Sequence, residues 1–235
     1  MFLDVFFTQQ DDTLSVSRHQ ASSFAKDVAG DFNAIHDIDA KRFCVPGDLL
    51  FSLVLNHYGL SQSMQFEFTN MVGDNTSLQF PEANNDEIVI NDEKDKTYLT
   101  VKHSGEITNN EALITNLVHQ YVAFSGQTFP FILVPLMHKN NVMINTSRPL
   151  VIYKNMSITL ERLDISSPVL KLSNSMLNIQ GKRGTASIEF DVIAQGEIVG
   201  HGNKTTVLSG LREYDQKSID DLIYSYIHQK LAYQQ

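Results

Sequence analysis

The residues best suited to chemistry lie in the segment 30–36, which reads Gly-Asp-Phe-Asn-Ala-Ile-His. Asp31 and His36 are five positions apart with Asn33 between them, and this spacing does not place the acid and the imidazole on one helical face. We therefore expect a loop that turns a carboxylate, a carboxamide and an imidazole toward one point. A carboxylate and an imidazole that hold one water molecule can remove one proton and return another.

An apolar helix is predicted directly after this loop, over Pro46–Tyr58. Proline suits a first helical turn, and Gly59 stands where the helix should end. The N–H groups at a helix start can stabilise negative charge that develops on a carbonyl oxygen. Gly47 is therefore the candidate oxyanion donor and Asp48 a further substrate-binding candidate, although Pro46 itself has no N–H group.

A purely structural interpretation of the loop stays open. Asp31 would then be a turn or cap residue, Asn33 would form its own Asx turn, and His36 would be a hydrogen-bonded loop histidine. The acids of the loop do not predict a metal site, because Ile35 occupies a ligand position of the calcium-loop pattern and no glycine follows it. The lone Cys44 lies in an apolar stretch, which favours a core residue over a reactive thiol.

Composition narrows the range of partners. The 235 residues include 18 basic and 27 acidic residues, a net charge of −9, which argues against a nucleic-acid or anionic-membrane binder. A single cysteine excludes an intramolecular disulfide and fits a reducing compartment. The N-terminus has no basic region before its apolar residues, and no apolar run approaches the length of a membrane span. We expect a soluble, cytoplasmic protein with no bound metal and no permanently bound cofactor.

The remaining elements alternate between helix and strand patterns. Helices are expected at 20–28 and from Asn109 or Asn110 to about Phe124. A last amphipathic helix, opened by Ser218 with Asp221, is expected at 219–233, and its apolar side is formed by Leu222, Ile223, Tyr226 and Leu231. Strands are expected at 2–7, 13–18, 64–71, 77–80, 87–91, 97–103, 151–163, 169–179, 185–195 and 197–208, with turns that include 84–86 and the hairpin at Gln195-Gly196.

The order of helix and then strands occurs twice along the chain. The segment Phe43–Leu50 precedes the first strand set much as Gln127–Leu133 precedes the second. We interpret the apolar runs Leu49–Leu55 and Phe129–Leu136 as the two core helices. The pattern predicts two α+β units, residues 1–108 and 109–235, each with a buried helix wrapped by a curved antiparallel sheet.

The segment from Gly30 to His36, with Ala40 and then Phe43–Leu50, resembles the hydratase motif of MaoC-like, (R)-specific enoyl-CoA hydratases. That motif reads Gly-Asp-x-Asn-Pro-aliphatic-His and leads into a glycine-led apolar helix. The resemblance covers about residues 28–52, and it departs from the family at Ala34, which replaces the proline, and at Pro46, where a histidine normally precedes the glycine. As a whole, the chain also resembles a small family of bacterial proteins, a likeness that implies no activity.

The resemblance implies a double hot-dog fold and an acyl-thioester substrate of fatty-acid metabolism, with coenzyme A as part of the substrate. It implies that Asp31 and His36 activate water, that Asn33 orients them, and that amides at the helix start hold the thioester oxygen. The expected protein is a hydratase or dehydratase that forms a homodimer. Two alternatives stay open: a non-catalytic hot dog that binds acyl-CoA or a protein partner, and a thioesterase that uses Asp48.

Lys182 and Arg183 form a small basic turn between two glycines. With Lys204 or Arg162 nearby in a sheet, this turn is a weak candidate for binding the phosphates of coenzyme A. The simpler interpretation is a solvated hairpin tip.

Overall fold

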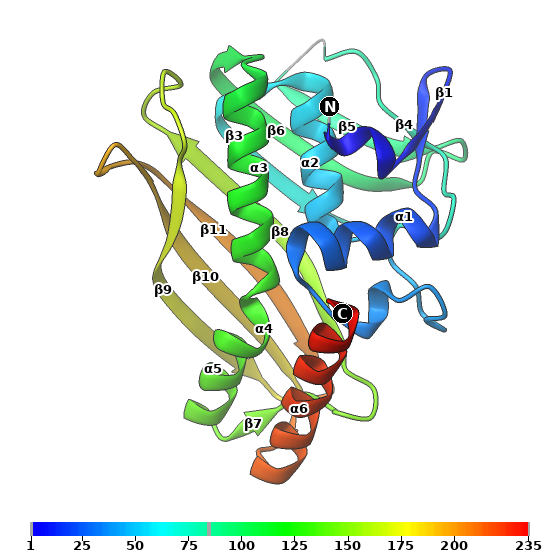
Figure 1. Ribbon diagram of the computed structural model, residues 1–235, viewed down its shortest axis with the longest axis vertical. Helices are drawn as coiled ribbons and strands as arrows, with labels where there is room; N and C mark the ends of the chain where they lie inside the picture. The colour runs from blue at the N-terminus through cyan, green and yellow to red at the C-terminus, as the bar shows by residue number, and fades with distance from the viewer. Residues whose placement is uncertain (1, 84–85, 235) are drawn as a thin grey trace.

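A computed structural model describes residues 2–83 and 86–234 (Figure 1). In this described part of the chain, ten strands form one sheet in which every neighbouring pair is antiparallel, in the order β1-β2-β4-β5-β6-β3-β8-β11-β10-β9. The strands are Thr8–Gln10 (β1), Thr13–Ser15 (β2), Leu60–Phe68 (β3), Leu78–Gln79 (β4), Glu87–Asp92 (β5), Thr97–Thr108 (β6), Val151–Leu160 (β8), Val169–Gln180 (β9), Arg183–Ala194 (β10) and Glu197–Ser209 (β11). Two short strands, Val142–Met143 (β7) and Arg212–Glu213 (β12), pair separately.

The α-helices are Arg18–Ser23 (α1), Gly47–Tyr58 (α2), Glu111–Gly126 (α3), Thr128–Phe131 (α4), Leu133–Lys139 (α5) and Gln216–Tyr233 (α6). A π-helix continues α1 over Phe24–Ala29 (η2), and 3-10 turns occur at Phe2–Val5 (η1) and Ala34–His36 (η3). None of the helices among the described residues is both long and apolar enough to cross a membrane.

The helices α2 and α3 lie side by side on one face of the curved sheet (Figure 1). Their buried side chains form one core with the central strands, in which Phe51 of α2 contacts Phe66 of β3 and Tyr121 of α3. The two halves of the sheet join where β3 pairs with β8, with Phe66 opposite Met156. Two long helices wrapped by a continuous antiparallel sheet make this a double hot dog, and the fold class is as predicted. The division into units 1–108 and 109–235 stays a prediction.

Several local predictions are confirmed. The helix after the loop begins at Gly47, with Pro46 as its N-cap, and ends at Tyr58, with Gly59 as its C-cap. Asn110 caps α3 by accepting a hydrogen bond from the Leu113 N–H. The hairpin at Gln195-Gly196 has both residues at positive φ, as a tight turn between antiparallel strands requires.

Three predictions are wrong. Residues 2–7 begin with a 3-10 turn and not a strand. The second core helix is α3, because the run 129–136 is interrupted by Pro130 and Pro135 and forms only the short helices α4 and α5. The last helix starts at Gln216, since the side chain of Asp215 accepts from the Ser218 N–H and provides the cap. The turn expected at 84–86 includes two residues outside the described range.

Candidate functional site

The loop that carries Asp31 begins where η2 ends. Gly30 takes the left-handed conformation (φ 62°), and the N–H groups of Gly30 and Asp31 both donate to the carbonyl of Ala25. Gly126, at the end of α3, approaches this segment so closely that a Cβ there would lie 1.9 Å from the Ala29 carbonyl oxygen. The left-handed turn and the close approach together bring the loop against the end of α3.

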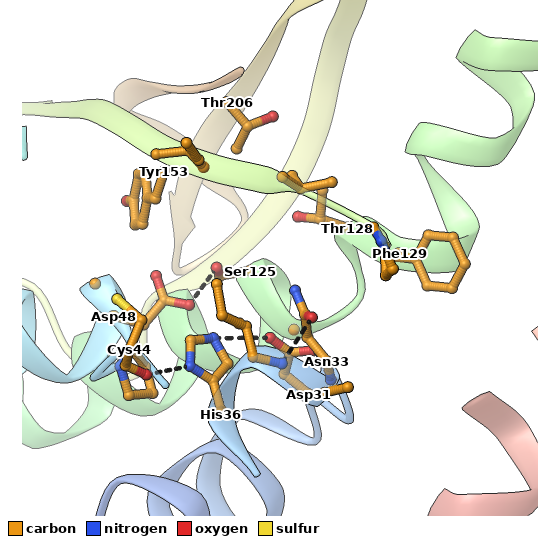
Figure 2. A pocket seen from close by; sticks show the side chains of 18 of the residues that line it. Asp31, Asn33, His36, Cys44, Asp48, Ser125, Thr128, Phe129, Tyr153 and Thr206 are labelled. Carbon is orange, nitrogen blue, oxygen red and sulfur yellow. Dashed lines mark hydrogen bonds and ion pairs between the residues drawn. The ribbon is translucent and has the colours of Figure 1, made fainter. Parts of the chain in front are cut away.

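Within the loop, Asp31, Asn33 and His36 converge on one cavity, as the sequence predicts (Figure 2). Asp31 Oδ1 accepts from the Asn33 N–H at 3.0 Å, and Asp31 Oδ2 lies 3.9 Å from His36 Nε2. The side-chain oxygen of Asn33 accepts from the Ile35 N–H and so caps η3. Asn33 therefore forms the Asx turn of the structural interpretation and also fixes the loop that holds the acid and the imidazole.

The orientation of His36 is set by its other ring nitrogen. Nδ1 lies 2.7 Å from the carbonyl oxygen of Cys44, a distance at which a protonated Nδ1 donates to this oxygen. In a neutral ring this bond leaves the lone pair on Nε2, which faces Asp31. His36 is thus oriented to accept a proton at Nε2.

The electrostatic environment of Asp31 favours its protonated form. Burial raises the pKa of the Asp31 carboxyl above its ordinary value, and the neighbouring Asp48 adds to the effect. His36, the Asn33 N–H and Lys204 oppose it by stabilising the charged form. Burial also raises the pKa of the Cys44 thiol, to about 11, so this cysteine is a thiol and not a thiolate at neutral pH.

The start of α2 forms the next part of the cavity wall. The first N–H groups of a helix have no acceptor within the helix, which leaves those of Gly47 and Asp48 available to a ligand. Gly47 lies against Tyr153 of β8, and a Cβ at this position would come within 2.6 Å of its ring. Only glycine fits this position without displacing the Tyr153 ring.

A buried polar cluster that the sequence analysis did not predict lies beside the start of α2. Ser125 of α3 donates to Asp48 Oδ2 at 2.5 Å and accepts a hydrogen bond from Lys204 of β11. Lys204 Nζ lies 3.9 Å from Asp48 Oδ1 and 4.3 Å from the centre of the Tyr153 ring. Asp48, Ser125 and Lys204 are each less than a tenth exposed, so the charges compensate one another inside the protein.

The structure does not bring Lys204 or Arg162 to the basic turn of Lys182 and Arg183, where we considered them as further phosphate contacts. Lys204 points to the core because alternate residues of a strand share a face, and its neighbours two and four positions on, Thr206 and Leu208, are buried with it. Arg162 binds Asp164. Lys182 and Arg183 lie at the turn between β9 and β10, and neither lines the cavity.

The cavity has a volume of about 570 Å³ and a mixed lining. In Figure 2, Asp31 and His36 lie on one side and Tyr153 and Thr206 on the opposite side, with Ser125 between them. Its apolar lining comes mainly from α2, β8, the short helices α4 and α5 and the loop after β3: Leu50, Val151, Ile152, Phe129, Leu133 and Val72. Such a cavity suits a ligand that is largely apolar and carries a few polar atoms.

Helix α6 lines the loop side of the cavity with Leu222, Ser225, Tyr226 and Gln229, and Tyr226 also contacts the loop through its hydroxyl. The Tyr226 hydroxyl accepts from the Phe32 N–H at 3.2 Å and lies within 3.5 Å of Asp31 Oδ1, of the Gly30 carbonyl and of the Gly126 carbonyl. Tyr226 is 9% exposed, whereas Leu231, which we expected on the buried side of this helix, is 56% exposed. The helical periodicity locates Tyr226 on the apolar side but does not reveal its contact with the loop.

Residues 1–217 match the family described as "Protein of unknown function (DUF3581)", and the chain belongs to this family. No curated protein matches the sequence.

Solved structures of hot-dog proteins are similar to the chain at low sequence identity. A tesB protein of Mycobacterium avium subspecies paratuberculosis is 9% identical, with 88% of this chain and 96% of that chain covered and a TM-score of 0.47. A hot-dog protein of Alicyclobacillus acidocaldarius is 8% identical, with 88% of this chain and 97% of that chain covered and a TM-score of 0.46. A MaoC-like dehydratase is 10% identical, with 85% of this chain and 96% of that chain covered and a TM-score of 0.41. With TM-scores below 0.5, none of these likenesses indicates which reaction the chain carries out.

Proposed function

We propose that the protein is an acyl-thioester hydratase or dehydratase, which adds water to an enoyl thioester or removes it from a 3-hydroxyacyl thioester. The observation that carries this proposal is the pair formed by Asp31 and His36. A carboxyl group with a raised pKa faces an imidazole nitrogen that is free to accept a proton, and both line a largely apolar cavity.

The raised pKa of Asp31 and the orientation of His36 support the following roles in the two proton transfers. His36 Nε2 takes a proton from water as the water oxygen bonds to C3 of the enoyl group. The π electrons of the double bond shift toward the thioester, and protonated Asp31 delivers its proton to C2. The His36 imidazolium then returns a proton to the Asp31 carboxylate across the gap of 3.9 Å. The net change is the addition of one water molecule, and the site returns to its starting state.

Charge develops on the thioester oxygen during this step. The N–H groups of Gly47 and Asp48 at the start of α2 would hold this oxygen, and the dipole of a twelve-residue helix adds to their effect. Asn33 would act on the reaction through the loop geometry that it caps and not by contact with the reacting atoms.

The proposed carrier is coenzyme A, bound only as part of the substrate. The exposed Lys96 lines the cavity and offers a positive charge to a phosphate of the carrier. This lysine replaces the turn at Lys182 and Arg183 as the candidate phosphate contact.

The test is turnover of trans-2-butenoyl-CoA and of a longer enoyl-CoA, followed at the enoyl absorbance. We expect hydration by the wild type and a loss of about 10²–10⁴-fold in both Asp31→Asn and His36→Gln, the magnitude typical of a general acid or base. Asp39→Asn, an exposed acid of the same loop, is the matched control and should keep full activity. A folded wild type that hydrates neither substrate would exclude the proposal.

Asp48 supports a second candidate, thioester hydrolysis. Asp48 Oδ1 is buried without a hydrogen-bond partner among the described residues, and Asp48 lines the same cavity. A carboxylate at this place could orient a water molecule toward the thioester carbon. Release of free thiol from saturated acyl-CoA, abolished by Asp48→Asn and kept in Asp31→Asn, would favour this candidate. Acyl-CoA binding without either reaction would favour a non-catalytic binding protein.

A further inference from the structure

Three buried polar atoms in the wall of the cavity lack a hydrogen-bond partner. Among the described residues, the side-chain oxygens Asp48 Oδ1, Thr128 Oγ1 and Thr206 Oγ1 are all buried without a hydrogen-bond partner, and all three residues line the cavity. Their exposed fractions are 8%, 6% and 3%. Figure 2 shows the Thr128 hydroxyl directed toward the space between Asp31 and Tyr153.

A buried polar atom without a hydrogen-bond partner lowers the stability of the fold unless a ligand supplies the missing hydrogen bond. A buried polar group that loses its hydrogen bonds on folding is penalised, and native proteins leave few of them. The hydroxyl groups are not needed for packing, because valine has nearly the same shape as threonine and would fill the same space without a polar atom. At position 206 the same face of β11 continues with the fully apolar Leu208. The hydroxyls without hydrogen-bond partners therefore indicate that the cavity binds a ligand with a polar group.

The charges in the cavity wall restrict the charge of this polar group. Asp48 and Lys204 compensate each other, and Lys204 already donates to Ser125. A carboxylate on the ligand would face Asp48, and an ammonium group would face Lys204, so a charged group meets a like charge in either case. A neutral group that both donates and accepts avoids this conflict, and it can exchange hydrogen bonds with the Thr128 or Thr206 hydroxyl or donate to Asp48 Oδ1. A hydroxyl group has these properties.

We propose that the cavity selects acyl groups that carry a hydroxyl substituent along the chain, bound at the Thr128 or Thr206 hydroxyl or at Asp48 Oδ1, over plain hydrocarbon chains. This inference rests on the proposed acyl-thioester function and adds the class of acyl group to it. The apolar lining around the three oxygens holds the rest of the chain.

The test compares the binding of saturated acyl-CoA pairs of equal length by calorimetry. The pairs are 4-hydroxybutanoyl-CoA with pentanoyl-CoA and 6-hydroxyhexanoyl-CoA with heptanoyl-CoA, none of which is a substrate for hydration. We expect the hydroxylated member of at least one pair to bind about tenfold more tightly, the effect of one or two buried hydrogen bonds. Thr128→Val or Thr206→Val should reduce this preference, with no fall in unfolding temperature, and a preference that both variants keep would contradict binding at the threonines.

The matched control is Thr205→Val, a neighbour on β11 whose hydroxyl already donates to Asn203, and it should keep the preference. Equal or tighter binding of the hydrocarbon member in both pairs would overturn the inference, whatever the hydration assay shows. A hydroxyl preference in a protein that does not hydrate enoyl-CoA would instead overturn the proposed reaction and leave the binding inference standing. If no acyl-CoA binds, both are wrong.

Discussion

At the scale of single residues, the burial of Asp31, the proposed general acid, carries a cost in stability. Burial raises its pKa from the ordinary value of 3.8, so the folded protein keeps a proton on Asp31 at pH values at which the unfolded chain has released it. Folding then binds protons in this window, and the contribution of Asp31 to the free energy of unfolding falls as the pH rises through the folded pKa.

The variant Asp31→Asn removes this contribution. We expect its stability relative to the wild type to increase from about pH 4, near the ordinary pKa of 3.8, to about pH 8, measured by urea unfolding at both values. The control variant Asp39→Asn should keep the same difference in stability from the wild type at both pH values. A wild type and Asp31→Asn that differ equally at both pH values would show that Asp31 has the same pKa in the folded and unfolded states.

The ion pair of Asp48 and Lys204 gives a second prediction at this scale. In Lys204→Met, the buried Asp48 carboxylate loses its compensating charge, and we expect a loss of about 3–5 kcal/mol in the free energy of unfolding. Adding Asp48→Asn to this variant should restore much of the loss, because no uncompensated charge then remains. A double variant no more stable than Lys204→Met would contradict the assigned pairing.

At the scale of elements, α6 holds the loop through Tyr226. In Tyr226→Phe the Phe32 N–H loses its acceptor, and the Gly30 and Asp31 contacts lose their donor. We expect faster hydrogen exchange at Phe32 and a fall of about tenfold in activity, as the loss of one or two hydrogen bonds would give. Tyr224→Phe, 71% exposed on the same helix, is the control and should change neither. Unchanged exchange at Phe32 would show that α6 does not order the loop.

The end of α3 gives a further prediction at this scale. Gly126→Ala places a Cβ against the Ala29 carbonyl and should push α3 away from η2, at a cost of about 1–3 kcal/mol in stability and with a loss of activity. Gly73→Ala is the matched control, since its nearest atom would lie at an ordinary contact distance of 3.6 Å. Thermal unfolding of the two variants checks this, and equal transition temperatures would contradict it.

At the scale of the whole molecule, the sequence predicts the parts of the fold that depend on neighbouring residues. Pro46 and Gly59 delimit α2, and the motif from Asp31 to His36 forms one wall of the site, because both depend on local spacing. The opposite wall depends on contacts between residues 77 and 79 positions apart, such as Ser125 with Asp48 and Lys204. No local pattern predicts such contacts. The difference at 129–136 has another cause, because Pro130 and Pro135 interrupt an apolar run that otherwise favours one long helix.

The edge of the sheet bears on the proposed homodimer. Strand β9 is an edge of twelve residues with one side unpaired, and Val169, Leu172 and Met176 are 46%, 41% and 57% exposed. Long apolar edge strands favour pairing with another strand. We expect a dimer in solution by light scattering and a monomer for the double variant Leu172→Lys with Met176→Lys. A monomeric wild type would contradict the proposed homodimer.

The most direct measurement of the central claim is a crystal structure of Asp31→Asn with a bound trans-2-enoyl-CoA. The account predicts that the thioester oxygen accepts from the N–H groups of Gly47 or Asp48, and that C2 and C3 lie between residue 31 and His36. A thioester whose carbonyl carbon instead faces the Asp48 carboxylate, with the double bond remote from His36, would contradict the hydratase assignment and favour hydrolysis.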